Sequence, residues 1–161
     1  MLQFTTTLGN FSVSLNTALA PKTCKNFLSY VKAKHYDGLI FHRIIPGFMV
    51  QGGGMEPSLS PRKTKKPINS EAANGLGNKR GSIAMARTQD PHSATSQFFI
   101  NLVDNEFLDY ASNPPGYTVF GEITAGLEVI DAMAKVATTN RRGHQDVPVE
   151  DIVILSVSEI D

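Results

Sequence analysis

Residues 41–54 read Phe-His-Arg-Ile-Ile-Pro-Gly-Phe-Met-Val-Gln-Gly-Gly-Gly, and no other stretch of the chain combines so much apolar bulk with one isolated cation. The β-branched and aromatic residues on both sides of Pro46-Gly47 predict two short strands, 41–45 and 48–51, joined by a turn. Arg43 stands among hydrophobic neighbours, and its guanidinium needs a hydrogen-bonding partner because it keeps its proton. A structural ion pair, a head group that reaches water and a bound ligand all satisfy this requirement.

A second stretch, Ser96-Gln97-Phe98-Phe99-Ile100-Asn101, again places a long amide and aromatic rings on a predicted strand. Strand alternation puts Gln97 and Phe99 on one face and Phe98 on the other. Together, the two stretches predict an apolar pocket with an arginine and a glutamine at its rim.

With these residues in view, the chain resembles the cyclophilins, a family of peptidyl-prolyl cis/trans isomerases. The resemblance is carried by residues 41–53, by Ala84-Met85-Ala86, by residues 96–100 and by Val119-Phe120-Gly121. The segments 64–68, Glu71-Ala72 and 144–148 are similar to the bacterial branch of the family.

The composition is typical of one globular domain, which we expect to span residues 1–161. The formal net charge is zero, with 15 basic and 15 acidic residues, so neither nucleic-acid nor membrane binding driven by bulk charge is expected. The single cysteine, Cys24, cannot form an internal disulfide, and the first residues lack the features of a signal peptide. We therefore expect a soluble, cytoplasmic protein and, in the absence of a heptad pattern, a monomer.

Short β-rich segments recur along the chain. Strands are predicted at residues 2–7, 11–15, 41–45, 48–51, 82–86, 97–102, 119–123 and 151–158. Apolar stripes predict a helix of about three turns after Pro21 and a short helix over 127–134, and the first stripe includes Cys24 as a buried, inert thiol. Residues 55–80 are predicted to be mostly loop, and 105–108 a helical turn.

This pattern predicts a mainly β fold, an antiparallel barrel or sandwich, because it has no alternation of strands with long helices. The cyclophilin resemblance implies a closed eight-stranded antiparallel β-barrel capped by two α-helices.

Rotation about an Xaa-Pro bond is slow because amide resonance must be lost, at a barrier of about 20 kcal/mol, and no covalent bond has to break. A catalyst therefore needs a pocket for the proline ring and a donor to the prolyl nitrogen, and we expect no cofactor. Arg43 fits the donor role.

The resemblance implies specific site residues. It makes Arg43 catalytic, assigns the proline pocket to Phe48, Met49, Phe99 and Leu108, and gives Gln51, Ala86 and Gln97 the binding of substrate backbone or the orientation of the arginine. Core packing is the alternative for the apolar members, and strand alternation favours it for Phe41 and Phe98.

Four further positions beside the predicted groove depart from the family pattern. Phe107 stands where cyclosporin-sensitive members carry a tryptophan, Tyr117 stands where many have a histidine, and Arg87-Thr88 replaces a smaller, uncharged pair. We expect all four to contact substrate. Because Phe107 lacks an indole N–H, we expect isomerase activity with weak cyclosporin binding.

Other chemistries have weaker support. The histidines are scattered without the spacing of a metal site, and His42 should face away from Arg43 in a structural role. Ser96, His92 and Asp90 could be drawn as a hydrolase triad, but no Gly-x-Ser-x-Gly elbow is present.

Two functions remain open. One is an isomerase that acts on proline-containing peptides and on unfolded or flexible chains, and so assists protein folding. The other is a proline-segment binding module or chaperone with incidental turnover. The presence of Arg43, Gln51 and Phe99 together favours the enzyme.

Overall fold

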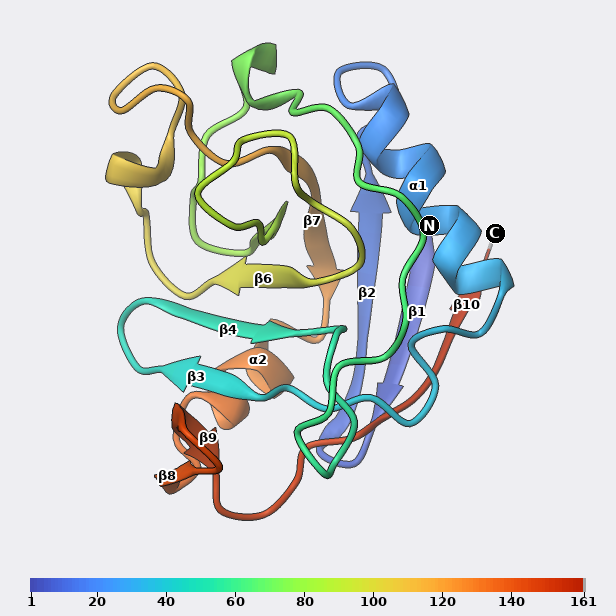
Figure 1. Cartoon of the computed structure of the whole chain (residues 1–161), viewed down its shortest axis with the longest axis vertical. Helices are drawn as coiled ribbons and strands as arrows, with labels where there is room; N and C mark the ends of the chain where they lie inside the picture. Colours follow the sequence, from blue (N-terminus) through green and yellow to red (C-terminus); the bar gives the residue numbers. More distant parts are fainter. Residues whose placement is uncertain (161) are drawn as a thin grey trace.

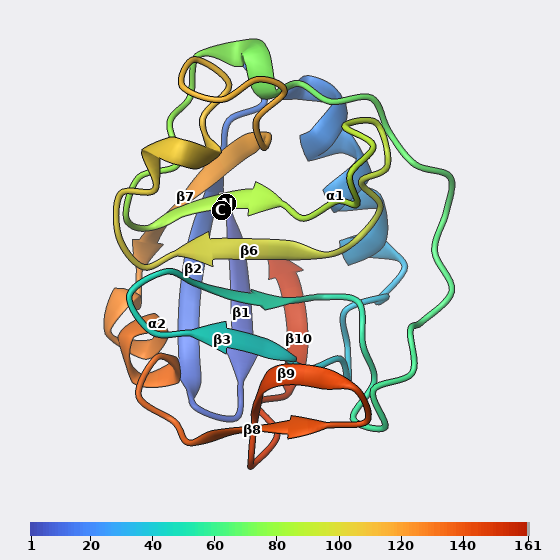
Figure 2. The same ribbon diagram turned by 60° about the vertical axis from the view of Figure 1, so that its left-hand side comes forward.

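The computed structural model describes residues 1–160, which form an eight-stranded antiparallel sheet, two α-helices and a separate two-stranded hairpin. The strands of the large sheet are β1 (Leu2–Thr6), β2 (Gly9–Leu15), β3 (Arg43–Ile45), β4 (Met49–Gly52), β5 (Ser82–Met85), β6 (Phe98–Asn101), β7 (Val119–Ala125) and β10 (Ile154–Glu159). Their order in the sheet is β10-β1-β2-β7-β5-β6-β4-β3. The curled sheet has α1 (Pro21–Lys32) near one end and α2 (Leu127–Met133) near the other (Figure 1, Figure 2).

The predicted mainly β fold of eight antiparallel strands and two α-helices is confirmed. The sheet curls into a half-barrel, however, so the prediction of a closed barrel overstates its closure. No ladder joins the edge strands β3 and β10 within residues 1–160. The segment before β3 forms only isolated β-bridges in place of a continuous ladder. Ile40 makes one such bridge with Met55 and another with Val153. Because this segment is irregular, single hydrogen bonds such as Phe41 N to Ile152 O, 3.0 Å, take the place of a closing ladder.

Helix α1 begins at Pro21, whose missing N–H is not needed in the first turn. It buries Cys24, as the sequence predicts, together with Phe27 and Val31. Ala20, the residue before it, has no side chain that can cap the helix. The carboxylate of Glu71 caps it instead.

Glu71 lies in the predicted loop, which contains one 3-10 turn, η1 (Ala72–Asn74). Its oxygens accept hydrogen bonds from Thr23 N at 2.7 Å, Thr23 Oγ1 at 2.8 Å and Lys22 N at 3.3 Å. These contacts fasten the long loop to the helix.

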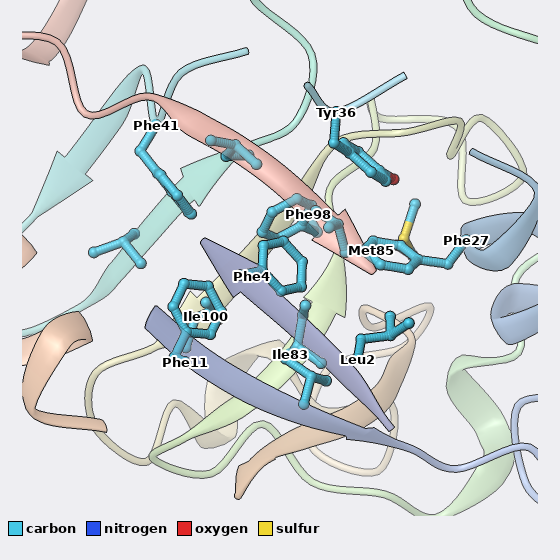
Figure 3. Close-up of a cluster of buried hydrophobic side chains, with 14 of the residues drawn as sticks. Leu2, Phe4, Phe11, Phe27, Tyr36, Phe41, Ile83, Met85, Phe98 and Ile100 are labelled. Carbon is cyan, nitrogen blue, oxygen red and sulfur yellow. The ribbon is translucent and has the colours of Figure 1, made fainter. Parts of the chain in front are cut away.

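The interior of the barrel is filled by aromatic rings packed around Phe98 (Figure 3). The Phe98 ring centroid lies 5.6 Å from that of Phe4, 5.6 Å from that of Phe27 and 5.9 Å from that of Phe41. Phe41 and Phe98 are fully buried, which confirms the core role predicted for them.

Strand alternation then turns the neighbouring side chains to the outer face. Phe99 on β6, Met49 on β4 and Ala84 on β5 belong to a second apolar cluster, separate from the barrel core. The outer face of the sheet therefore has an apolar surface of its own, and the candidate site lies there.

The hairpin of β8 (Thr138–Arg141) and β9 (His144–Pro148) was not predicted. Its strands are mostly polar, β8 is exposed over three of its four residues, and β9 buries only its last two residues, so neither strand has the alternation that marks a half-buried strand. None of the helices in the described part of the chain is both long and apolar enough to span a bilayer.

Candidate active site

Five strands place one row of side chains across the outer face of the sheet. Arg43 on β3 lies opposite Gln51 on β4, Gln51 lies opposite Phe99 on β6, and Phe99 lies opposite Ala84 on β5. Ala84 in turn lies opposite Val119 on β7. Directly opposed residues share a face, so the register joins an arginine, a glutamine and three apolar side chains in one line. Figure 2 shows β3, β4 and β6 side by side on the near face.

A cavity of about 130 Å³ opens along this row. Its lining consists of Arg43, Phe48, Met49, Gln51, Ala86, Arg87, Phe99, Leu108 and Tyr117. All of these residues belong to the predicted site. Leu108 reaches the cavity from the 3-10 turn η2 (Glu106–Leu108), where the sequence predicts a helical turn.

The other three predicted residues lie around the cavity and not in its lining. Phe107 is 56% exposed and its ring stacks on that of Phe48, with centroids 5.6 Å apart. Thr88 is exposed beside Arg87. Gln97 lies behind Gln51 and accepts a hydrogen bond from Gln51 Nε2 at 3.0 Å.

The Arg43 guanidinium is exposed and has no carboxylate within 4.0 Å among residues 1–160, so it makes no structural ion pair there. Within residues 1–160 its one side-chain hydrogen bond is a long one from Nη1 to Gln51 Oε1, 3.5 Å. The Gln97 side chain packs against Gly54 so closely that a Cβ added to Gly54 would overlap the Gln97 side chain. Gln97 is thereby held where it contacts Gln51. This arrangement leaves most of the N–H groups of Arg43 available to a ligand.

Arg87 forms an ordered part of the cavity wall. Its Nε and Nη2 donate hydrogen bonds to Gly116 O at 3.2 and 2.7 Å, and Nη1 donates to Thr88 O at 2.9 Å. The guanidinium carbon lies 4.2 Å from the centroid of the Tyr117 ring, which itself packs edge-on against Phe99. The sequence marks Arg87 as unusual, but it gives no sign of the distant carbonyl that fixes its side chain.

A buried network of asparagines, which was not predicted from the sequence, supports the wall of the cavity. Asn105 Nδ2 donates to Phe48 O at 3.0 Å and to Asn101 Oδ1 at 2.8 Å. Asn101 Nδ2 donates to Asn78 Oδ1 at 3.1 Å and to Ser82 Oγ at 2.9 Å. The sequence contains one indication of this network. Asparagine is disfavoured within strands, and Asn101 follows three apolar strand residues.

His42 is buried on the opposite side of β3 from Arg43, as the alternation predicts. Its ring lies 6.5 Å from that of His144, and its Nδ1 has no hydrogen-bond partner among the described residues. Burial, and to a lesser extent the positive charges of His144 and Arg43, lower the pKa of His42 from 6.5 to about 4. His42 is therefore neutral at pH 7.

Side chains considered for other chemistry are engaged elsewhere. Ser96 is buried and donates to Gly53 O at 2.8 Å, while His92 Nδ1 accepts from Ser70 N, so neither is arranged as part of a hydrolase triad. Burial raises the pKa of the Cys24 thiol to about 11, which keeps it protonated and unreactive. In the part of the chain that the structure describes, no three His, Cys, Asp or Glu side chains are grouped to hold a metal ion.

Comparison with known proteins agrees with this geometry. The family model "Cyclophilin type peptidyl-prolyl cis-trans isomerase/CLD" matches residues 1–159. A peptidyl-prolyl cis-trans isomerase of Streptomyces antibioticus is 53% identical over 158 residues, which cover 96% of this chain and 95% of that one. Peptidyl-prolyl cis-trans isomerase B of Escherichia coli is 50% identical, with 98% of each chain covered. A Cryptosporidium parvum cyclophilin crystallised in the presence of the dipeptide Ala-Pro superposes with a TM-score of 0.86 at 25% identity, covering 99% of this chain and 98% of that one.

Proposed function

The chain belongs to the cyclophilin-type peptidyl-prolyl cis-trans isomerases, and we propose that Arg43 is the group through which it accelerates rotation about Xaa-Pro bonds. The observation that carries this proposal is the position of Arg43. It lies at the rim of an apolar cavity, is held by one long hydrogen bond to Gln51, and is paired with no carboxylate of residues 1–160.

The chemistry follows from the change that the prolyl nitrogen undergoes. In the planar amide its lone pair is delocalised, and in the twisted amide it becomes a hydrogen-bond acceptor. A guanidinium N–H donated to that nitrogen stabilises the twisted state more than the planar one, which is the condition for raising kcat. If this bond contributes about 3 kcal/mol, it accelerates rotation roughly a hundredfold.

We assign the proline ring to the floor of the cavity, formed by Met49, Phe99 and Leu108, with Phe48 at its edge. Met49, Phe99 and Leu108 are at least nine-tenths buried, so the ring would replace water over a preformed apolar surface. Gln51 and Gln97 orient Arg43 or bind the substrate backbone beside it. The substrates are proline-containing peptides and unfolded or flexible chains, as suggested by the Ala-Pro dipeptide of the Cryptosporidium protein.

A proline-binding or chaperone role with incidental turnover is the second candidate. The exposed ring of Phe107, stacked on Phe48, favours it, because this pair extends the apolar surface beyond the cavity. The two candidates share one site and differ in whether Arg43 changes the rate or only the affinity.

We also propose that cyclosporin binds weakly, since Phe107 cannot donate the hydrogen bond of an indole N–H. Phe107→Trp should tighten binding by about tenfold, the value of one added hydrogen bond. Calorimetric titration of both proteins tests this proposal, and equally tight binding by the native protein would contradict it.

We further propose that residues 1–161 act as one domain and as a monomer in the cytoplasm. One buried cluster joins residues from both ends of the chain, Leu2 and Val157 among them, which supports a single folding unit. The only cysteine is buried and unpaired, as is common where the environment is reducing. Sedimentation of the purified protein tests the monomer directly.

The proposed activity is tested by cis/trans exchange in a short Ala-Pro peptide, followed by NMR exchange spectroscopy. We expect the native protein and Lys25→Ala, which removes an exposed cation outside the cavity, to accelerate exchange equally. We expect Arg43→Ala to lose about a hundredfold in kcat/KM while keeping its fold, and Arg43→Lys to recover only part of that loss. Equal acceleration by native protein and Arg43→Ala would refute the role of Arg43.

A further inference from the structure

The candidate active site has an unbalanced charge. Arg43 and Arg87 both line the cavity, and none of the acidic residues that the structure describes lines it. The ion pairs of residues 1–160 are Arg62 with Glu56, Arg80 with Asp131 and Arg141 with Asp151, so neither cavity arginine has a carboxylate within 4.0 Å in that part of the chain. The whole chain has a formal net charge of zero, and the excess positive charge is therefore local to this site.

Arg87 is held in place without being neutralised. Its three hydrogen bonds go to the carbonyls of Gly116 and Thr88, and its flat face lies over Tyr117. Carbonyl oxygens and an aromatic ring orient a guanidinium, but they carry no negative charge that would neutralise its unit positive charge. A guanidinium has five N–H donors, so at least two N–H groups of Arg87 remain for a partner.

The two arginines approach the cavity from opposite sides. Arg43 lies on β3 and Arg87 lies two residues beyond the end of β5, with β4 and β6 between these strands in the sheet. The surface between them is formed by Met49, Phe99 and the uncharged amide of Gln51, so it offers no compensating charge. A concave apolar surface flanked by charges of one sign concentrates the field that a bound ligand experiences.

We propose that the site selects prolines flanked by an acidic side chain, and that Arg87 is the residue that determines this selectivity. This inference rests on the proposed function, because it concerns the substrate of the same site. Because Arg43 is directed at the reacting amide, Arg87 is the arginine that pairs with the carboxylate of the substrate residue next to proline. The guanidinium is already ordered by Gly116, Thr88 and Tyr117, so little side-chain entropy is lost on pairing.

The expected effect is moderate because Arg87 is only half-buried. An ion pair in such a position favours the acidic substrate by about threefold to fivefold in kcat/KM, and the preference weakens as salt screens the charges.

Two matched pairs of end-blocked peptides test the proposal. One pair, Ala-Glu-Pro-Ala and Ala-Gln-Pro-Ala, changes the residue before proline, and the other, Ala-Pro-Glu-Ala and Ala-Pro-Gln-Ala, changes the residue after it. The readout is the ratio of kcat/KM for the Glu peptide to that for the Gln peptide, which cancels changes in overall activity. The proteins compared are the native chain, Arg87→Gln, Arg87→Lys and the control Lys25→Gln.

We expect a Glu/Gln ratio of about three to five for at least one pair with the native protein and with Lys25→Gln. The ratio should fall toward one in Arg87→Gln, stay above one in Arg87→Lys, and shrink in about 0.5 M salt. A native ratio of one or less for both pairs, or a ratio unchanged by Arg87→Gln, would overturn the inference while leaving the isomerase function intact. Failure to accelerate any of the four peptides would instead refute the proposed function, and the inference with it.

Discussion

Asn105→Ala removes the side chain that joins the buried asparagine network to the cavity. Asn105 is 3% exposed, and its Nδ2 donates to Phe48 O and to Asn101 Oδ1. After the substitution, Phe48 O still accepts a hydrogen bond from Leu102 N at 3.0 Å. Asn101 Oδ1 has no other donor in the structure and is left buried and unpaired.

The magnitude follows from that one orphaned acceptor. Leaving a buried acceptor unpaired costs about 1–3 kcal/mol, and we expect about 2 kcal/mol here. For a chain of this size each kcal/mol lowers Tm by about 2–4 °C, so Tm should fall by about 4–8 °C. Because Asn105 also holds the Phe48 carbonyl, the wall of the cavity loosens, and kcat/KM should fall about threefold to tenfold.

Urea unfolding of a double-mutant cycle measures the effect. Asn101→Ala and Asn105→Ala each break the same hydrogen bond, so the double variant should be more stable than the sum of the two losses predicts, by about 1 kcal/mol. Asn105→Asp has nearly the same shape but presents acceptors to Phe48 O and Asn101 Oδ1, and it should be less stable than Asn105→Ala. Losses that add within about 0.3 kcal/mol, or an Asn105→Asp as stable as the native protein, would refute the reasoning.

Three further predictions concern the cap, the buried histidine and the glycine behind Gln97. Glu71→Ala removes the acceptor of Thr23 N and Oγ1 and should lower the free energy of unfolding in urea by about 2 kcal/mol; no change would show that α1 needs no cap. The folded pKa of His42 lies below its unfolded value, so unfolding takes up a proton as the pH falls from 6.5 toward about 4. The free energy of unfolding of the native protein should therefore fall by about 2 kcal/mol between pH 7 and pH 5, and that of His42→Gln should not show this fall. Parallel dependences of the free energy of unfolding on pH in the two proteins would contradict this. Gly54→Ala should displace Gln97 and lower kcat/KM about tenfold in the exchange assay with little loss of stability, and full activity would exclude orientation of Arg43 through Gln97.

Most strands of the large sheet could be predicted from the sequence because their apolar residues follow a clear strand pattern. Phe98 and Phe99 are assigned to opposite faces by alternation alone, and the structure places Phe98 in the barrel core and Phe99 in the outer cluster. Part of the candidate site is predictable in the same way, since strand register brings Arg43, Gln51 and Phe99 to the outer face. Leu108 comes instead from the 3-10 turn η2, and only the family resemblance assigns it to the cavity.

The remaining features depend on contacts that no local pattern encodes. The gap between β3 and β10 reflects irregular pairing around Ile40, and the cap of α1 comes from Glu71, 48 residues beyond Thr23. The fixed position of Arg87 depends on a carbonyl 29 residues away. Residue types indicate which side chains can act, whereas tertiary contacts determine which of them are held in place.

The central claim is that Arg43 stabilises the twisted amide more than the bound substrate, and exchange at saturating peptide tests it most directly. NMR line shapes of an Ala-Pro peptide, measured with native protein and with Arg43→Ala, give the Kd and the rate of cis/trans interconversion on the enzyme. We expect Arg43→Ala to change Kd less than about threefold and to slow the bound interconversion roughly a hundredfold. A hundredfold weaker Kd with an unchanged interconversion rate would contradict this expectation, and would make Arg43 a binding residue.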